Sequence, residues 1–516
     1  MANTMIAPEA LPDARKYLIF GVMAFGQFLA LIDIQIVASS LNEVRAGLSA
    51  SADEISWVQT AYLMAELVMI PFAAFLAQAM STRWLFALSA GLFTVASALC
   101  GLAWSIESMI AFRALQGFVG GAMVPTVFAT GFVLFTGKQR AMIPAILGMV
   151  SVLAPTMGPT LGGWITDAFS WRWIFYVNIV PGTLVAVLAF LLIRVDQADP
   201  SMLRRIDWMH LAAMAVFLGG LEYVLEEGPR NDWFEDEAIA IGGWLSFVAL
   251  LLFLERSFRS SRPIVSLTPF RRPTFVFACV FNLVIGFGIY SATYLVPVFL
   301  GTVRGYNASE IGTTVFVAGL IQMLGVPVAA ALSQRIDPRI MITCGLGLFA
   351  AGLWMFSFMT PEWGFHALLW PQAVRSFAIM LCIVPSVTMA LAGFEGPELR
   401  YASGLFNLMR NLGGAIGIAL VNTWLQDNGR LHMLRLGEAL GSAGRSGGEL
   451  IEALARHAST ITPDPARALM MAQALAGRIV QREALTLAFN DVFRLMALLF
   501  LAALVLVPFC RPVRQG

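Results

Sequence analysis

The sequence is poor in charged residues, in lysine and in catalytic motifs. Only 13% of its 516 residues are charged, whereas a soluble domain carries roughly 25%. Lysine occurs only at Lys16 and Lys138, and the Gly137–Lys138 pair has Phe132 where a P-loop needs glycine. No HExxH motif is present. An enzyme, an ATP-driven pump and a nucleic-acid-binding protein are therefore not indicated.

Cysteine is also scarce. The five cysteines all fall in or beside apolar runs, where a thiol behaves as a small hydrophobic group. We expect no disulfide framework, no metal site and no cofactor.

Hydrophobic residues make up 58% of the chain. A helix needs about 20 apolar residues to cross a bilayer, and the first such run is too long for a signal-peptide core. The sequence therefore predicts an all-α polytopic membrane protein with fourteen transmembrane helices. The predicted spans cover residues 17–40, 55–78, 84–104, 107–135, 141–168, 173–193, 208–227, 238–255, 274–300, 308–334, 339–360, 365–393, 400–425 and 490–510.

Basic residues are distributed unevenly between the two sets of predicted loops. The loops on the side of the N-terminus hold both lysines and most arginines, whereas the short loops opposite hold only Arg45, Arg172, Arg230 and Arg304. Short cytoplasmic loops carry an excess of basic residues. Both termini are therefore predicted to be cytoplasmic, and segment 426–489, which is too long for this rule, faces outward.

The predicted spans suggest three parts. Residues 1–200 would form one six-helix bundle, 201–262 two inserted helices, and 263–516 a second six-helix bundle. Many secondary carriers consist of two such halves. The outward segment 426–489 has helical patterns interrupted by GSAGRSGG, and Asp464 and Pro465 are typical of a helix start. It is expected to form a helical hairpin.

Ionisable residues inside the predicted spans are the main functional candidates, because they are costly in hydrocarbon. A rise of about 1.5 Å per residue puts Asp33, Glu66 and Arg113 at depths where they could meet. Asp33 is the first candidate for proton coupling, and a permanent structural ion pair with Arg113 is the alternative. Glu66 could carry a proton or contact a substrate. Arg113 is always charged and would set the pKa of the carboxylate.

Other polar residues in the spans are candidates for lining a substrate cavity. Arg375 could bind an anionic group, or it could only join helices. Glu222 approaches the outer end of its span and is expected at the interface. Buried acids would suit lipophilic cations and buried arginines would suit weak acids, so the substrate class stays open. The cavity candidates are Gln35, Asn282, Gln372 and Arg375.

The fifth predicted span contains the glycine-rich stretch GMVSVLAPTMGPTLGGW, residues 148–164. Glycine lets neighbouring backbones approach closely, and proline leaves a bend. The stretch predicts a bent helix with a close-packing face. That face would include Gly158, Pro159, Gly162 and Gly163.

Several of these motifs resemble those of a known family. GPTLGG (158–163) looks like the antiporter signature in the fifth helix of major facilitator superfamily exporters, and FRALQGFVGGAMVPT (112–126) resembles the fourth-helix arginine motif. LIDIQIV (31–37), WRWIFYVNIVPG (171–182) and FNLMRNLGGAIG (406–417) are similar to the fourteen-span drug/proton antiporter branch of EmrB/QacA type. The resemblance covers essentially the whole chain.

The resemblance implies a function. Proteins of this type export hydrophobic small molecules across the bacterial inner membrane by proton-driven alternating access, and some act with a periplasmic adaptor and an outer-membrane channel. By position, Arg113 and Gln116 match the arginine motif, and Asp33 matches the first-helix acid. By this resemblance, the protein would lie in membrane lipid and would use the proton gradient as its energy source. Proton-coupled uptake remains the alternative.

The sequence departs from the family pattern in two places. The loop motif between the second and third spans reads AFLAQAMSTRW (74–84), with Gln78 where an acid is expected. This places the cytoplasmic gating contact of that motif in question. In the first span, Gln35 and Ala38 replace a usual threonine and asparagine, so specificity could differ.

Overall fold

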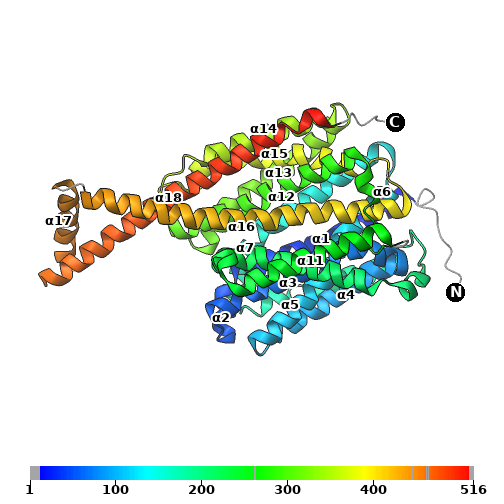
Figure 1. Ribbon diagram of the computed structural model, residues 1–516, viewed down its shortest axis with the longest axis horizontal. Coiled ribbons are helices and arrows are strands. Elements are labelled where there is room, and N and C mark those ends of the chain that lie inside the picture. The colour runs from blue at the N-terminus through cyan, green and yellow to red at the C-terminus, as the bar shows by residue number, and fades with distance from the viewer. Residues whose placement is uncertain (1–11, 261–262, 443–444, 461, 463, 511–516) are drawn as a thin grey trace.

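The computed structural model describes residues 12–260, 263–442, 445–460, 462 and 464–510. These residues form an all-helical bundle whose long helices lie side by side (Figure 1). Thirteen helices of the described part are long and apolar enough to cross a membrane. The fifth predicted span is occupied by α7 (Met142–Ala168), of which Met142–Ser151 is a shorter apolar segment. The predicted all-α polytopic fold is confirmed.

The first half of the chain contains several interrupted helices. Its elements are α1 (Asp13–Ser39), α2 (Leu41–Leu48), α3 (Ala52–Met80), α4 (Thr82–Gly101), α5 (Ile106–Gly120), α6 (Met123–Leu134), α7, α8 (Trp173–Tyr176) and α9 (Ile179–Leu192). The fourth predicted span is thus two helices, α5 and α6, separated at Gly121 and Ala122. The sixth is divided into α8 and α9.

The second half of the chain is preceded by a pair of helices, α10 (Trp208–Glu227) and α11 (Glu237–Arg259). The later helices are α12 (Pro273–Phe299), α13 (Ala308–Ser333), α14 (Pro338–Phe356), α15 (Phe365–Leu391), α16 (Gly396–Ser442), α17 (Arg445–Ser459) and α18 (Pro465–Leu504). The helices α10 and α11 pack against each other, and α10 also contacts α3 and α16. The division at residues 200 and 262 stays a prediction.

Helix starts are fixed by side chains that bond to free backbone amides. Ser51 and Glu54 form a reciprocal capping box at the start of α3, and Asn307 and Glu310 do the same for α13. The predicted start of the last helix is confirmed, because Asp464 accepts a hydrogen bond from the Ala466 amide at 3.0 Å and Pro465 is the first residue of α18.

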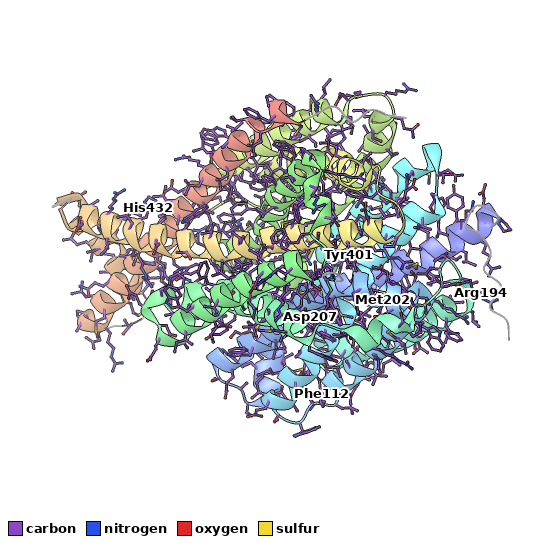
Figure 2. All side chains as sticks on the ribbon, turned by 45° about the vertical axis from the view of Figure 1, so that its right-hand side comes forward. Phe112, Arg194, Met202, Asp207, Tyr401 and His432 are labelled. Atoms are coloured by element: carbon purple, nitrogen blue, oxygen red, sulfur yellow. The ribbon has the colours of Figure 1, made fainter. Side chains whose placement is uncertain are left out.

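The segment predicted to face outward is helical. The helices α16 and α18 continue beyond the bundle, and α17 joins their far ends (Figure 1). Figure 2 labels Tyr401 near the start of α16 and His432 on its extension. His432 Nε2 lies 2.7 Å from Asp491 Oδ2 of α18, which ties the two helices together. The described chain begins and ends at the opposite end of the bundle (Figure 1).

Candidate functional site

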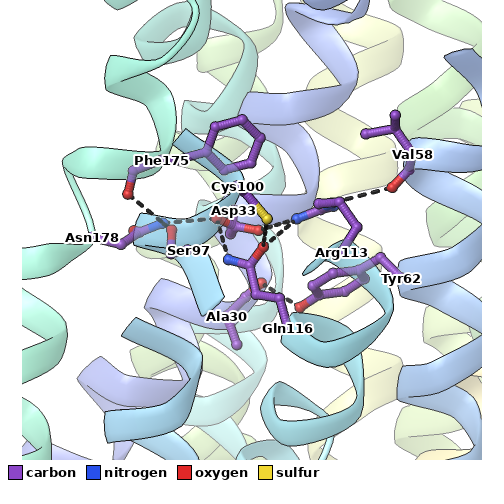
Figure 3. A network of polar contacts seen from close by, with 10 residues as sticks. All are labelled: Ala30, Asp33, Val58, Tyr62, Ser97, Cys100, Arg113, Gln116, Phe175 and Asn178. Carbon is purple, nitrogen blue, oxygen red and sulfur yellow. Dashed lines mark hydrogen bonds and ion pairs between the residues drawn. The ribbon is translucent and has the colours of Figure 1, made fainter. Parts of the chain in front are cut away.

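Asp33 of α1 lies at the centre of a buried polar network (Figure 3). Arg113 Nη1 donates to Asp33 Oδ2 at 2.6 Å, and Gln116 Nε2 donates to Asp33 Oδ1 at 3.1 Å. Asn178, between α8 and α9, donates a third bond to Oδ1 at 2.7 Å. The ion pair that the depth count predicted is therefore present, and its side chains are 0% exposed.

A second layer of bonds fixes the donors. Arg113 Nε donates to the Val58 carbonyl of α3 at 3.2 Å, and its guanidinium lies 4.2 Å from the centroid of the Tyr62 ring. Asn178 also donates to Ser97 Oγ at 3.1 Å. Arg113 is thus also held by α3 and Asn178 by α4, so the network around the Asp33 carboxylate joins α1, α3, α4, α5 and the start of α9 (Figure 3).

Glycines allow the helices that carry this network to approach. A Cβ at Gly117 would lie 2.2 Å from the Tyr62 carbonyl oxygen, and one at Gly121 would lie 2.7 Å from the Glu66 carbonyl oxygen. Only glycine fits at such separations. The glycines of the arginine motif thus set α5 directly on α3, which brings Arg113 to Val58.

The glycine-rich stretch makes a similar seam between α7 and α1. A Cβ at Gly158 would lie 2.4 Å from Gln35 Cβ, and one at Gly162 would lie 2.8 Å from the Ile36 carbonyl oxygen. The helix α7 continues without a break through Pro159 and Gly163. The close-packing face is therefore present at Gly158 and Gly162, and the bend stays a prediction.

Glu66 lies near the network but is not part of it. Its side chain is buried on α3, at 5% exposure. Among the described residues no hydrogen bond or ion pair joins it to Asp33 or Arg113, although Arg113 and Arg410 both act on it electrostatically. The structure thus brings two of the three predicted ionisable residues into contact, and Glu66 lies close by.

A cavity of about 580 Å³ lies between the two halves of the chain. Its walls come from the end of α1 with the start of α2, the starts of α3 and α13, the middle of α7, the end of α10, and the second parts of α12 and α16. Most of these segments lie toward the end of the bundle that carries α17. Exposed Arg230 and Gln426 line its rim, so the cavity reaches the surface at that end.

Only one of the four predicted cavity residues lines this cavity. Gln35 is on its wall. Asn282 instead donates to the Phe406 carbonyl at 2.6 Å, and Gln372 donates to the Thr314 carbonyl at 3.2 Å. Arg375 is 3% exposed on α15, and its Nε and Nη1 atoms have no partner among the described residues. A substrate role for the last three stays a prediction.

The opposite end of the bundle is closed by contacts between the halves. Ser403 Oγ of α16 donates to the Pro125 carbonyl of α6 at 2.9 Å. Asp196, just after α9, pairs with Arg400 of α16. The same carboxylate accepts bonds from the Thr82 backbone amide at 3.0 Å and from Thr82 Oγ1 at 2.7 Å.

Sequence reasoning missed Asp196 and Asn178. Asp196 gave only the weak signal of an acid directly after a span. It lies beside Thr82, the first residue of α4 and part of the altered loop motif, so this chain has an acid there despite Gln78. Glu222 was expected at the membrane interface. Its side chain is buried in the protein, at 4% exposure, because α10 packs against α3 and α16, and its depth in the membrane stays a prediction.

Taken together, the long apolar helices, the buried ion pair and a cavity open at one end define a multi-pass membrane carrier. The model of the Major Facilitator Superfamily matches residues 23–418, and the chain belongs to this superfamily. Within it the chain is a member of the EmrB family of transporters, and it is not an enzyme.

Two curated relatives cover nearly the whole chain. The colistin resistance protein EmrB of Acinetobacter baumannii is 37% identical over 488 residues, which is 95% of each chain. The multidrug export protein EmrB of Escherichia coli K12 is 27% identical over 508 residues, 98% of this chain and 97% of the relative.

A third relative and a solved structure extend the comparison. The fatty acid resistance protein FarB of Neisseria gonorrhoeae is 28% identical over 412 residues, 80% of this chain and 81% of that one. The crystal structure of the human organic anion transporter MFSD10 (TETRAN) has a TM-score of 0.55 at 14% identity, covering 95% of this chain and 100% of its own. At that identity the likeness concerns the fold alone.

Proposed function

We propose that this protein is a proton-coupled antiporter that exports hydrophobic small molecules across the bacterial inner membrane. The observation that carries the proposal is the buried Asp33 carboxylate, held by Arg113, Gln116 and Asn178 inside a membrane-spanning bundle. The printed names of the relatives, which include multidrug export and resistance to colistin and to fatty acids, support export as the direction.

The geometry supplies a way to couple the proton to the cavity. Asp33 and Gln35 lie two residues apart on α1, one in the network and the other on the cavity wall. A proton on Asp33 would remove the charge that its three donors bind. The bonds joining α1 to α5 and Asn178 would weaken, and the bundle could change from the outward-open to the inward-open arrangement.

In this account the cycle has four steps. The outward-open protein releases its substrate and Asp33 takes a proton from the outside. The bundle then opens to the cytoplasm, where Asp33 loses the proton and a new substrate binds. Re-formation of the ion pair with Arg113 favours return to the outward-open arrangement. Both termini are taken to be cytoplasmic, as the distribution of basic residues predicts.

The sign of the pH gradient tests the proposal. Purified protein in liposomes would be given lipophilic cations, lipophilic anions and fatty acids, with the lumen made acidic or alkaline. An antiporter accumulates its substrate when the lumen is acidic, because protons leave as substrate enters. Accumulation only with an alkaline lumen would instead indicate proton-coupled uptake, and no gradient-dependent accumulation of any compound would contradict a carrier of this kind.

We also propose that the extension formed by α16, α17 and α18 contacts a periplasmic adaptor, which would lead to an outer-membrane channel. The extension projects on the side predicted to be periplasmic, and it exposes Leu434 (65%) and Met470 (61%). A photo-crosslinking residue at either position should form an adduct with a membrane-fusion protein in the native cell. Adducts with lipid alone would contradict the proposal.

A further inference from the structure

The inserted helix α10 supplies an acidic part of the cavity wall. Glu226 and Glu227 both line the cavity. Thr60 Oγ1 donates to Glu227 Oε1 at 3.0 Å, so Glu227 has a partner in α3. Among the described residues, no hydrogen bond or ion pair reaches the carboxylate of Glu226. A carboxyl group that has no partner in the described chain and faces a cavity between the two halves is available to a ligand.

A second acidic side chain of the same helix lies close to Glu226. Glu222 lies one turn before Glu226, on the same face of α10. Its side chain is 4% exposed, and Oε2 has no hydrogen-bond partner within the described part of the chain. Glu226 and Glu66 are the charged groups that act on it. A buried carboxylate oxygen without a donor is unfavourable, and this one lies directly beneath the free carboxylate of the wall.

The basic residue of this wall, Arg230, acts on Glu226 electrostatically but forms no ion pair with the acids in the described chain. Arg230 follows α10 on the rim and is exposed. In the described chain no ion pair within 4.0 Å joins it to Glu226 or Glu227. The α10 side of the cavity therefore carries two carboxylates on the wall and a third behind them, against one solvated guanidinium.

The wall formed by α12 is aromatic. Tyr290 and Tyr294 line the cavity, and Glu226 is among the charges that act on Tyr294. The Tyr294 hydroxyl donates to Asn422 Oδ1 at 2.8 Å, and a Cβ at Gly414 would lie 2.5 Å from the Tyr290 ring. Both rings are thus held in place. Aromatic faces attract cations and pack against apolar bodies.

We propose that this cavity selects amphiphilic organic cations, with Glu226 as the carboxylate that recognises the cationic group. Tyr290 and Tyr294 bind the aromatic or apolar body of the same molecule. The inserted helix pair would then determine specificity. This inference rests on the proposed function, because it assumes that the cavity holds the exported compound.

Two ions of the same shape and opposite charge test the proposal directly. Tetraphenylphosphonium and tetraphenylborate would be bound to the purified full-length protein at equilibrium. The wild type should bind the cation at least tenfold more tightly than the anion. Glu226→Gln should weaken cation binding at least tenfold and leave anion binding unchanged or tighter, whereas Glu226→Asp should stay within threefold of the wild type. Glu235→Gln, on the exposed outer loop, is the matched control and should have no effect.

The outcomes separate this inference from the function on which it rests. Equal affinity of the wild type for the two ions, or unchanged cation binding in Glu226→Gln, would overturn the inference. The ratio of the wild-type affinities for the two ions tests the cation selectivity even if a variant fails to fold. If an anionic or uncharged compound is exchanged for protons while the cation is not preferred, antiport stands and only the cation selectivity fails. If no compound is exchanged for protons, the proposed function fails.

Discussion

Asp33 and Arg113 are fully buried, yet nearly all their polar atoms have partners. A buried ion pair stabilises a protein only if the remaining donors and acceptors are also bonded. Both Asp33 oxygens accept bonds, and Arg113 Nε and Nη1 donate to Val58, Asp33 and Gln116. Arg113 Nη2 is the buried atom of this pair without a partner in the described chain. The bonds of the pair therefore favour this arrangement of the helices. Arg113 Nη2 remains available for a bond in a different arrangement.

Removing Arg113 should destabilise the protein strongly. Arg113→Ala leaves the Asp33 carboxylate buried without its cation, and such losses cost about 3–5 kcal/mol. Reversible unfolding in mixed micelles would measure the change. Arg259→Ala is the control: it removes an exposed pair with Glu255, worth about 0.3–0.5 kcal/mol. Equal effects of the two substitutions would contradict the role given to Arg113.

The residues of this network were predictable to different degrees. Counting residues from the span ends put Asp33 and Arg113 at one depth, and the family motif added Gln116. Asn178 lies in a quoted motif, but its contact with Asp33 depends on how the short α8 places the start of α9, which no local pattern specifies. Glu226 was not among the candidates, because the contacts of α10 with α3 and α16 are a tertiary feature.

At the scale of elements, glycine seams set the separation of the helices. Gly158 and Gly162 bring α7 onto α1, and Gly117 brings α5 onto α3. The second half has the same construction, since a Cβ at Gly286 would lie 2.1 Å from the Arg410 carbonyl oxygen and one at Gly413 would lie 2.0 Å from that of Leu283. By their order in the two halves, α12 and α16 thus correspond to α1 and α7.

A single methyl group should disturb the seam between α7 and α1. In Gly162→Ala the new Cβ would meet the Ile36 backbone, and overpacking of this kind costs about 1–3 kcal/mol. We expect a lower melting temperature and reduced transport. Gly21→Ala on α1 is the matched control, because a Cβ there meets nothing within 4 Å. A melting temperature unchanged in both variants would mean that the seam does not depend on glycine.

The elements themselves were largely predictable, because each span needs about 20 apolar residues. The boundary between α16 and α17 falls inside GSAGRSGG, as expected, since α16 ends at Ser442 and α17 begins at Arg445; residues 443 and 444 lie outside the described residues. The helix α17 nevertheless includes the last two glycines of that stretch. Glycine costs about 1 kcal/mol in a helix, and the packing of α17 on α18 offsets it.

At the scale of the whole molecule, the halves are separated at one end and closed at the other. The cavity opens toward the α17 end, whereas Asp196, Arg400 and Ser403 join the halves at the end where the described chain begins and finishes. Neither feature could be predicted from the sequence, because their residues come from helices far apart along the chain. With both termini in the cytoplasm, as the basic residues predict, this arrangement would correspond to an outward-open carrier.

Weakening the closed end should increase the population of the opposite arrangement. Asp196→Asn removes the charge that Arg400 and Thr82 bind, and hydrogen bonds to charged groups contribute about 1.5–3 kcal/mol. Spin labels at Thr136 and Glu395, with the exposed Cys344 replaced, would report the distance across this end. We expect the longer-distance population to rise several-fold. Asp207→Asn, which removes the charge that pairs with Arg256 within the inserted helix pair, should leave the distribution unchanged. An identical distribution in both variants would contradict the role of Asp196.

The central claim is that Asp33 carries the coupled proton, and one measurement in proteoliposomes tests it most directly. A compound that the wild type accumulates inside liposomes with an acidic lumen would be used. The wild type and Asp33→Asn would be compared in accumulation driven by the pH gradient and in substrate counterflow without a gradient. The amide keeps the size of the side chain but carries no titratable proton. We predict that accumulation is lost while counterflow continues, because the cavity is intact. Proton-driven accumulation equal to that of the wild type would contradict the claim and leave the Asp33–Arg113 pair with a structural role alone.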